Sequence, residues 1–227
     1  MLINEYKYEE IRKQLSSNNV ILVAVSKTKP VEAIQELYNL GHRDFGENYV
    51  QELVEKQAQL PSDIHWHFIG HLQTNKVKYI APFVHLIHGV DSLKLLKEIN
   101  KQALKVGRVI SVLLQVHIAQ EETKFGFDSP ELEALFHSPS AELQALQNVH
   151  IRGFMGMASF TENKEQVRKE FASLKQLFDH YIKVTAPNVD LSILSMGMSG
   201  DYATAIGEGS TMVRIGSLIF GERTYAA

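Results

Sequence analysis

Lys27 is the residue whose type and position best suit covalent chemistry in this sequence. It follows the apolar run Val20–Val25, and because strand residues alternate between two faces, Val23, Val25 and Lys27 should share one face. If that face points into a barrel, the ammonium group lies at the mouth of an apolar interior, where desolvation increases the fraction of neutral amine. A neutral amine attacks aldehydes to form Schiff bases. The ordinary alternative is a lysine whose stem packs on the protein while its ammonium group reaches solvent.

Two segments rich in glycine and serine have the composition of an anion-binding site. Leu194–Asp201 contains Ser195 and Ser199, and Met212–Ser217 ends in Gly216 and a serine. Glycine lets backbone N–H groups approach an anion, and serine hydroxyls donate hydrogen bonds to it. The loops after strands seven and eight are the common phosphate site of (β/α)8 barrels. Ordinary turn chemistry is the alternative interpretation.

Arg214 lies inside the last apolar run, and a buried guanidinium is costly unless an anion compensates it. The structural partner would be a carboxylate, Glu47 or Glu222, and the functional one a phosphate or a cofactor ring nitrogen. His65 and His67 share a strand face, but no third ligand accompanies them, so we expect no metal site. Other polar residues follow expected strands and would reach the same mouth; they are Asn48, His71, Gln73, Asn75, Lys76, Thr123 and Lys124.

Apolar runs rich in β-formers alternate with helical patterns along the chain, which indicates βαβ units. We expect an N-terminal helix over 6–15, then helices over 31–40, 49–58, 76–80, 93–104, 130–136 and 164–181, with a further helical pattern from 202. The expected strands are 20–25, 44–47, 64–69, 83–90, 109–118, 151–157, 191–194 and 212–220, the last interrupted by Gly216.

This order predicts a single (β/α)8 TIM barrel over residues 1–227, with an extra N-terminal helix. An open, doubly wound sheet is the alternative fold. We disfavour it because the first strand–helix turn, Ser26–Pro30, lacks the glycine-rich phosphate fingerprint.

Composition narrows the function classes. The 227 residues include no cysteine, which excludes disulfides, thiolate metal sites and cysteine nucleophiles. The formal net charge of −3 gives no reason to expect nucleic acid. Because Met1–Ser16 lacks the apolar core of a signal peptide and no apolar run reaches membrane-span length, we expect a cytoplasmic protein with no membrane partner.

Five ordered segments resemble the pyridoxal phosphate homeostasis protein family, also called the YggS or PROSC family. They cover nearly the whole chain and are Ala24–Pro30, Phe45–Glu52, His65–Lys76, Leu191–Asp201 and Gly209–Gly221. The resemblance implies a fold type III protein that binds pyridoxal 5′-phosphate (PLP), with a barrel like the N-terminal domain of alanine racemase. It departs from the family at Gln115-Val116-His117, where the family usually has Asn in place of His117.

By this resemblance, Lys27 would be the Schiff-base lysine. Ser195, Ser199 and the backbone of Arg214–Gly216 would hold the phosphate, and Asn48 and Arg214 would lie beside the cofactor. The family is implied to buffer PLP within vitamin B6 homeostasis, or to deliver it to PLP-dependent apoenzymes, without an established catalytic activity. The sequence leaves the oligomeric state open between a monomer and a weak dimer.

Two enzymatic hypotheses stand beside a carrier. A PLP-dependent racemase or lyase would use the same lysine. However, alanine racemases carry a second domain with a catalytic tyrosine, and the sequence ends shortly after strand eight, so we expect little turnover. The other is a Schiff-base aldolase or phosphosugar isomerase on the same barrel, in which Lys27 would attack a substrate carbonyl.

Overall fold

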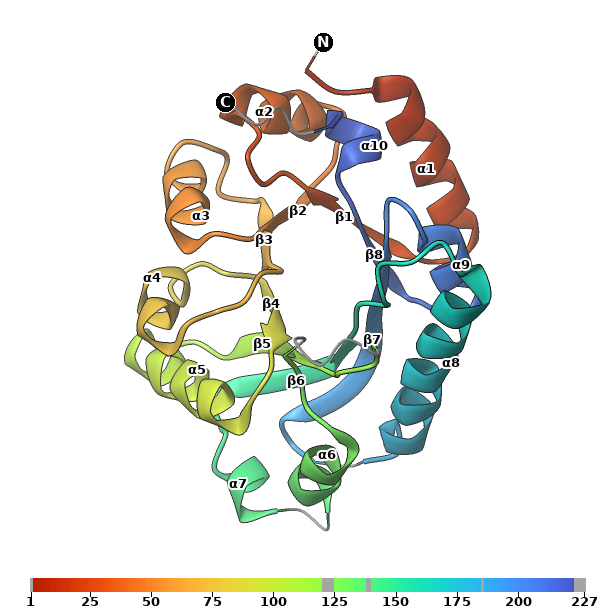
Figure 1. The fold of residues 1–227 in the computed structure, drawn as a ribbon. Helices are drawn as coiled ribbons and strands as arrows, with labels where there is room; N and C mark the ends of the chain where they lie inside the picture. The colour runs from red at the N-terminus through yellow and green to blue at the C-terminus, as the bar shows by residue number, and fades with distance from the viewer. Residues whose placement is uncertain (1, 120–124, 138–139, 185, 223–227) are drawn as a thin grey trace.

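Eight parallel strands close into a barrel in the computed structural model, which describes residues 2–119, 125–137, 140–184 and 186–222. Neighbouring strands in the sequence are neighbours in the barrel, and β1 pairs with β8 to close it. Figure 1 looks into the barrel, with the helices outside the ring of strands. The strands are β1 (Ile21–Val25), β2 (Asp44–Glu47), β3 (His65–Phe68), β4 (Leu86–Val90), β5 (Ile110–Gln115), β6 (Val149–Met155), β7 (Val189–Met198) and β8 (Met212–Ile215).

Helices cover the outer face of the barrel, and α1 packs beside α10 and β1 (Figure 1). The α-helices are α1 (Glu5–Ser17), α2 (Val31–Asn39), α3 (Val50–Gln57), α4 (Val77–Ile80), α5 (Leu93–Lys105), α6 (Ser129–Phe136), α7 (Ala141–Gln144), α8 (Lys164–Tyr181), α9 (Tyr202–Gly207) and α10 (Ser217–Phe220), and a 3-10 turn, η1, spans Thr74–Lys76. None of the described helices is both long and apolar enough to cross a membrane. The (β/α)8 barrel with its extra N-terminal helix is therefore confirmed.

Apolar side chains form two layers. A small cluster fills the barrel interior, with Val23, Leu86, Leu113, Met155 and Met212 at its centre. A larger cluster lies between the strands and the helices. Since Val23 faces the interior, the alternation along β1 places Val25 and Lys27 on the interior side as well.

The sequence patterns located the long elements best. The predicted helix over 164–181 is α8, whose apolar stripe of Val167, Phe171, Leu174 and Phe178 is buried. Ser92 caps α5 by accepting from the N–H of Leu95.

Two expectations were wrong. The segment after Gly216 is the short helix α10 rather than strand, because β8 ends at Ile215 and the chain turns at the glycine. β5 ends at Gln115 and Val109 is exposed, so the apolar run 109–118 overstates that strand. The helix predicted over 93–104 extends to Lys105 as α5; its last predicted residue, Leu104, is exposed, and its buried face is Leu95, Leu96, Ile99 and Ala103.

Candidate functional site

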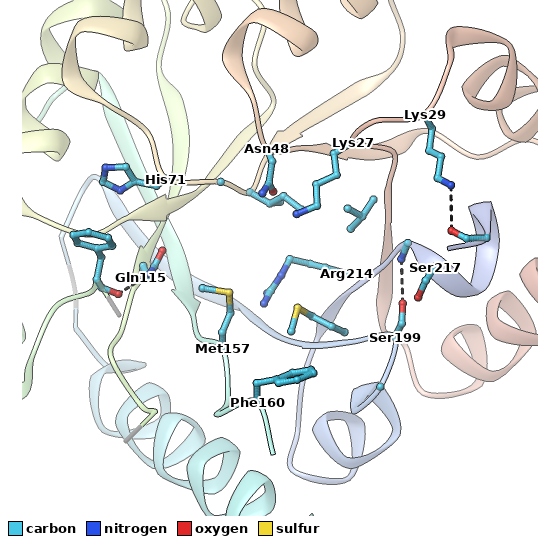
Figure 2. A pocket seen from close by; sticks show the side chains of 18 residues that line it. Lys27, Lys29, Asn48, His71, Gln115, Met157, Phe160, Ser199, Arg214 and Ser217 are labelled. Carbon is cyan, nitrogen blue, oxygen red and sulfur yellow. Dashed lines mark hydrogen bonds between the residues drawn. The ribbon is translucent and has the colours of Figure 1, made fainter. Parts of the chain in front are cut away.

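A cavity of about 590 Å3 opens at the carboxyl ends of the barrel strands. Figure 2 shows Lys27 and Arg214 pointing into it from neighbouring sides, with Met157 and Phe160 across from them. The lining residues are Val25, Lys27, Lys29, Asn48, Ile69, Gly70, His71, Gln115, Phe125, Met157, Phe160, Met198, Ser199, Gly200, Arg214, Gly216, Ser217 and Gly221. The cavity thus combines cations and small polar residues with apolar walls.

Lys27 lies in a tight turn directly after β1. The next residue, Thr28, has a φ of 65°, which is uncommon for any residue except glycine and unfavourable for a β-branched one. Such a conformation costs about 1–3 kcal/mol and persists only where its surroundings enforce it. Here the N–H of Thr28 donates to Glu52 Oε1 across 2.5 Å, so a contact from α3 holds the turn that presents Lys27.

A buried charged cluster of Lys56, Glu47 and Glu52 stabilises the same turn. Lys56 Nζ lies 2.7 Å from the carbonyl oxygen of Ser26, 2.8 Å from Glu47 Oε1 and 2.7 Å from Glu52 Oε1. Burial raises the pKa of Glu47 to about 7, against the lowering effects of Lys56 and Ser26. The cluster therefore ties α3 and β2 to the residues on both sides of Lys27.

The loop after β7 and the turn after β8 meet at one edge of the cavity. The N–H of Gly216 donates to Ser199 Oγ across 3.3 Å (Figure 2), and Gly200 and Ser217 line the cavity beside them. A Cβ atom at Gly216 would lie 3.0 Å from the carbonyl oxygen of Val25, so glycine keeps this edge open. Lys29 holds α10 in place by donating to the carbonyl oxygens of Phe220, Gly221 and Glu222 across 2.8, 3.1 and 3.0 Å.

Arg214 is 4% exposed and reaches the cavity floor from β8. It donates to Ser195 Oγ at 2.6 Å, to the carbonyl oxygen of Ser195 at 2.9 Å and to that of Gly156 at 3.1 Å. Burial lowers the pKa of its guanidinium to about 10, which leaves it charged at neutral pH. Neither carboxylate considered from the sequence, Glu47 or Glu222, is among its hydrogen-bond partners within the described residues.

The structure brings together five of the six residues singled out from the sequence: Lys27, Asn48, Ser199, Arg214 and Gly216 all line the cavity. Ser195 does not; it is fully buried beneath Arg214. His71 lines the cavity, whereas His117 is exposed and is not among its lining residues. Thr123 and Lys124 lie outside the described residues.

Sequence reasoning missed several lining residues. Gln115 lies at the end of β5 and donates to the carbonyl oxygen of Phe125 across 2.6 Å, and Phe125 and Phe160 form part of the wall. Gln115 could have been found as the polar residue that ends a long apolar run. The two aromatic residues lie in loops, where no periodic pattern marks them.

The site can bind an anion at one edge and present an amine beside it, with a cation below and apolar walls around. This combination fits a small, flat carbonyl compound that carries its own phosphate, because amine, anion donors and apolar surface face one cavity. Among the described residues, no group of three or more His, Asp or Glu side chains could hold a metal ion.

Comparisons with known proteins agree with the fold and point to one family. The model of the alanine racemase N-terminal domain matches residues 5–224. A protein of Aquifex aeolicus named pyridoxal phosphate homeostasis protein is 46% identical over 205 residues, covering 90% of this chain and 87% of its own. One of the same name from Escherichia coli K12 is 39% identical over 217 residues, covering 93% and 89%.

Solved structures give the same picture. PipY of Synechococcus elongatus, in its structure with PLP bound, superposes with a TM-score of 0.85 at 37% identity, covering 95% of this chain and 99% of that one. Alanine racemase from Bartonella henselae superposes with a TM-score of 0.70 at 16% identity, and this chain covers 62% of its length. The second likeness shows the fold alone.

Proposed function

This chain belongs to the pyridoxal phosphate homeostasis protein family, and from that premise we propose that it binds PLP on Lys27 and serves intracellular PLP homeostasis with little or no catalytic turnover. Residues 1–227 would form one PLP-binding domain, acting in the cytoplasm. The relatives that carry the family's name match over nine tenths of this chain. PipY, a structural relative of nearly equal length, has been solved with PLP bound.

One observation carries the assignment to residues: Lys27, Arg214 and the Ser199–Gly216 edge line the same cavity (Figure 2). When bound, PLP supplies an aldehyde that an amine can attach to reversibly. In our proposal Lys27 supplies that amine. Ser199 and the N–H groups of Gly200 and Gly216 hold the phosphate through charge-assisted hydrogen bonds.

The remaining lining residues would orient the bound cofactor and cover its ring. Arg214 would contact the cofactor ring from the cavity floor, and Asn48, directly after β2, would lie beside it. Val25, Met157 and Phe160 line the cavity and would cover the ring. A guanidinium is a donor that stays charged, so a ring nitrogen beside it remains unprotonated and the ring is a weaker electron sink. That property favours holding PLP over carbanion chemistry.

A PLP-dependent amino-acid racemase or lyase is the second candidate, and one observation favours it. His71 lines the same cavity and its Nδ1 lies 3.0 Å from Asp91 Oδ2, an arrangement that orients an imidazole for proton transfer. By contrast, no tyrosine is among the described residues that line the cavity.

A matched pair of conservative variants tests the PLP assignment. Lys27→Arg and Lys29→Arg each keep a cation in the cavity, but arginine cannot form a Schiff base. Wild-type protein mixed with PLP should absorb at about 420 nm. After borohydride reduction, the cofactor should be attached covalently to the peptide that contains Lys27, and this attached group is the label. Lys29→Arg should behave in the same way, while Lys27→Arg should carry no label. A label on another peptide, or no band in the wild type, would overturn the proposal.

Turnover assays separate the two candidates. Wild-type protein loaded with PLP should racemise or eliminate amino acids far more slowly than about 1 s⁻¹, a rate ordinary for enzymes. A rate of that order that is abolished by His71→Ala would show that the protein is an enzyme and not a carrier.

A further inference from the structure

A continuous chain of polar contacts crosses the barrel interior from the cavity to the opposite rim. It begins at Arg214, which donates to Ser195 Oγ across 2.6 Å. Ser195 Oγ lies 3.2 Å from His88 Nδ1, and His88 Nε2 lies 2.9 Å from His67 Nδ1. The chain ends where His67 Nε2 lies 3.0 Å from Asp44 Oδ1.

The members come from five strands and lie at successive depths. Asp44 is the first residue of β2, at the amino-terminal rim, and its side chain is 28% exposed. His67 and His88 lie within β3 and β4 and are 1% and 0% exposed. Ser195, on β7, is fully buried, and Arg214 on β8 lines the cavity. The chain therefore links the two ends of the barrel through its otherwise apolar centre.

With both imidazoles neutral, the chemistry of the two ends fixes the direction of every hydrogen bond. A guanidinium only donates, so Ser195 Oγ accepts from Arg214 and its hydroxyl proton points to His88 Nδ1. His88 must then carry its proton on Nε2 and donate it to His67 Nδ1. His67 in turn carries its proton on Nε2 and donates to Asp44, whose ionised carboxylate only accepts.

Burial and charge agree with this direction. Burial lowers the pKa of His88 well below its usual value, so this imidazole is neutral. Burial alone would raise the pKa of Asp44, but its contacts with His67 and His65 outweigh burial and lower it to about 2, so this carboxylate is ionised. Within the described residues, the hydrogen bonds of Arg214 go to Ser195 and Gly156 and not to a carboxylate. The charge of Asp201 acts on the guanidinium through space, and the chain of polar contacts leads from it to the carboxylate of Asp44.

We propose that Asp44, His67, His88 and Ser195 are positioning residues for Arg214: they orient its guanidinium toward the cofactor cavity and couple it to the negative charge at the far rim. The inference rests on the proposed function, since it gives Arg214 its task. It places Ser195 in this series of polar contacts, whereas the sequence predicted that Ser195 contacts the phosphate. Hydrogen bonds in such chains polarise one another, so a change at Asp44 alters the contact that Ser195 offers to Arg214.

The first test is a measurement on the protein without PLP. Nitrogen-15 NMR of histidine side chains should show His67 and His88 as neutral tautomers protonated on Nε2. Asp44→Asn should change the His67 signals and the side-chain signals of Arg214. The matched control is Asp63→Asn, which removes a carboxylate near the same rim that pairs with Arg43 at 2.8 Å outside the chain, and it should leave these signals unchanged.

The second test measures coupling. Asp44→Asn should weaken PLP binding by about three- to tenfold, although Asp44 does not line the cavity, and Ser195→Ala should weaken it by a similar factor. Because Asp44 acts through Ser195, adding Asp44→Asn to Ser195→Ala should have little further effect, whereas independent structural damage would multiply.

Several results would refute the inference. Either histidine protonated on Nδ1 in the wild type would show that the chain has another direction. Unchanged Arg214 signals in Asp44→Asn, or fully multiplicative losses in the double variant, would show that no coupling exists. Failure of the proposed function is distinguishable from these, because it would appear as an unlabelled wild-type protein while the tautomers stayed as derived.

Discussion

The ammonium group of Lys56 donates across 2.7 Å to the carbonyl oxygen of Ser26, the residue before Lys27. This contact joins α3 to the end of β1, and the same ammonium group neutralises Glu47, which is fully buried. The turn that presents Lys27 is therefore held from the protein interior by a buried ammonium group that also donates to Glu52.

Removing Lys56 should destabilise the whole barrel. Lys56→Met keeps the apolar stem but leaves the Glu47 carboxylate buried without a cation, which costs about 3–5 kcal/mol of unfolding free energy. Urea unfolding at pH 7.5 measures the loss. Lys7→Met is the control, since Lys7 pairs with Glu10 on the exposed face of α1, and its unfolding midpoint should not change. An equal midpoint for both variants would show that the buried cluster is not stabilising.

Arg214→Gln should weaken PLP binding by about 10- to 100-fold, because it removes a charged donor worth about 1.5–3 kcal/mol from the cavity floor. Fluorescence or absorbance titration with PLP gives the dissociation constant. The Lys27 label should persist at saturating PLP, since the lysine is unaltered. Unchanged affinity would make Arg214 a structural residue only.

Gly70 is expected to tolerate no side chain. A Cβ atom there would lie 2.3 Å from the backbone oxygen of Asn48, so Gly70→Ala must push apart the ends of β2 and β3 at a cost of about 1–3 kcal/mol. Gly207→Ala is the control, because nothing lies within 4 Å of its added Cβ and alanine favours helix α9. Thermal unfolding should show a lower midpoint for the first variant and an equal or higher one for the second.

Stability should fall as the pH drops below about 6.5, because the buried histidines together outweigh Glu47, whose raised pKa acts in the opposite direction. Burial lowers the pKa of His42 and of His85 to about 4 each, and that of His88 well below its usual value. The folded state therefore favours neutral imidazoles, and its advantage is complete above the unfolded pKa of about 6.5 and lost as the pH falls toward 4.

His42 alone should account for about 2–3 kcal/mol of that loss between pH 7.5 and 4.5, because folding lowers its pKa from 6.5 to about 4. Urea unfolding at several pH values between 7.5 and 4.5 measures how the free energy of unfolding depends on pH. His42→Gln should weaken this dependence even if the variant is less stable than the wild type at pH 7.5. A wild-type stability independent of pH over this range would contradict the neutral assignment.

Much of the fold followed from the sequence because periodicity reports which face of an element is buried. The stripe on α8 and the alternation through Val23, Val25 and Lys27 are local properties, and each survives in the structure. The turn to α10 was misread because the three apolar residues Leu218, Ile219 and Phe220 suit a strand or a buried helix equally well.

The type and order of residues by themselves determined that Lys27 and a glycine–serine edge would meet at one mouth, since all parallel strands of a barrel end on the same side. Only the tertiary structure decided how deeply each of these side chains lies in the barrel. Ser195 and Ser199 belong to one short motif, but four residues of strand span about 13 Å, so Ser199 reaches the cavity while Ser195 lies under Arg214. Likewise, Asp44, His67 and His88 lie on consecutive strands, but only barrel closure connects them to the arginine, because His88 contacts Ser195 on β7 across the interior.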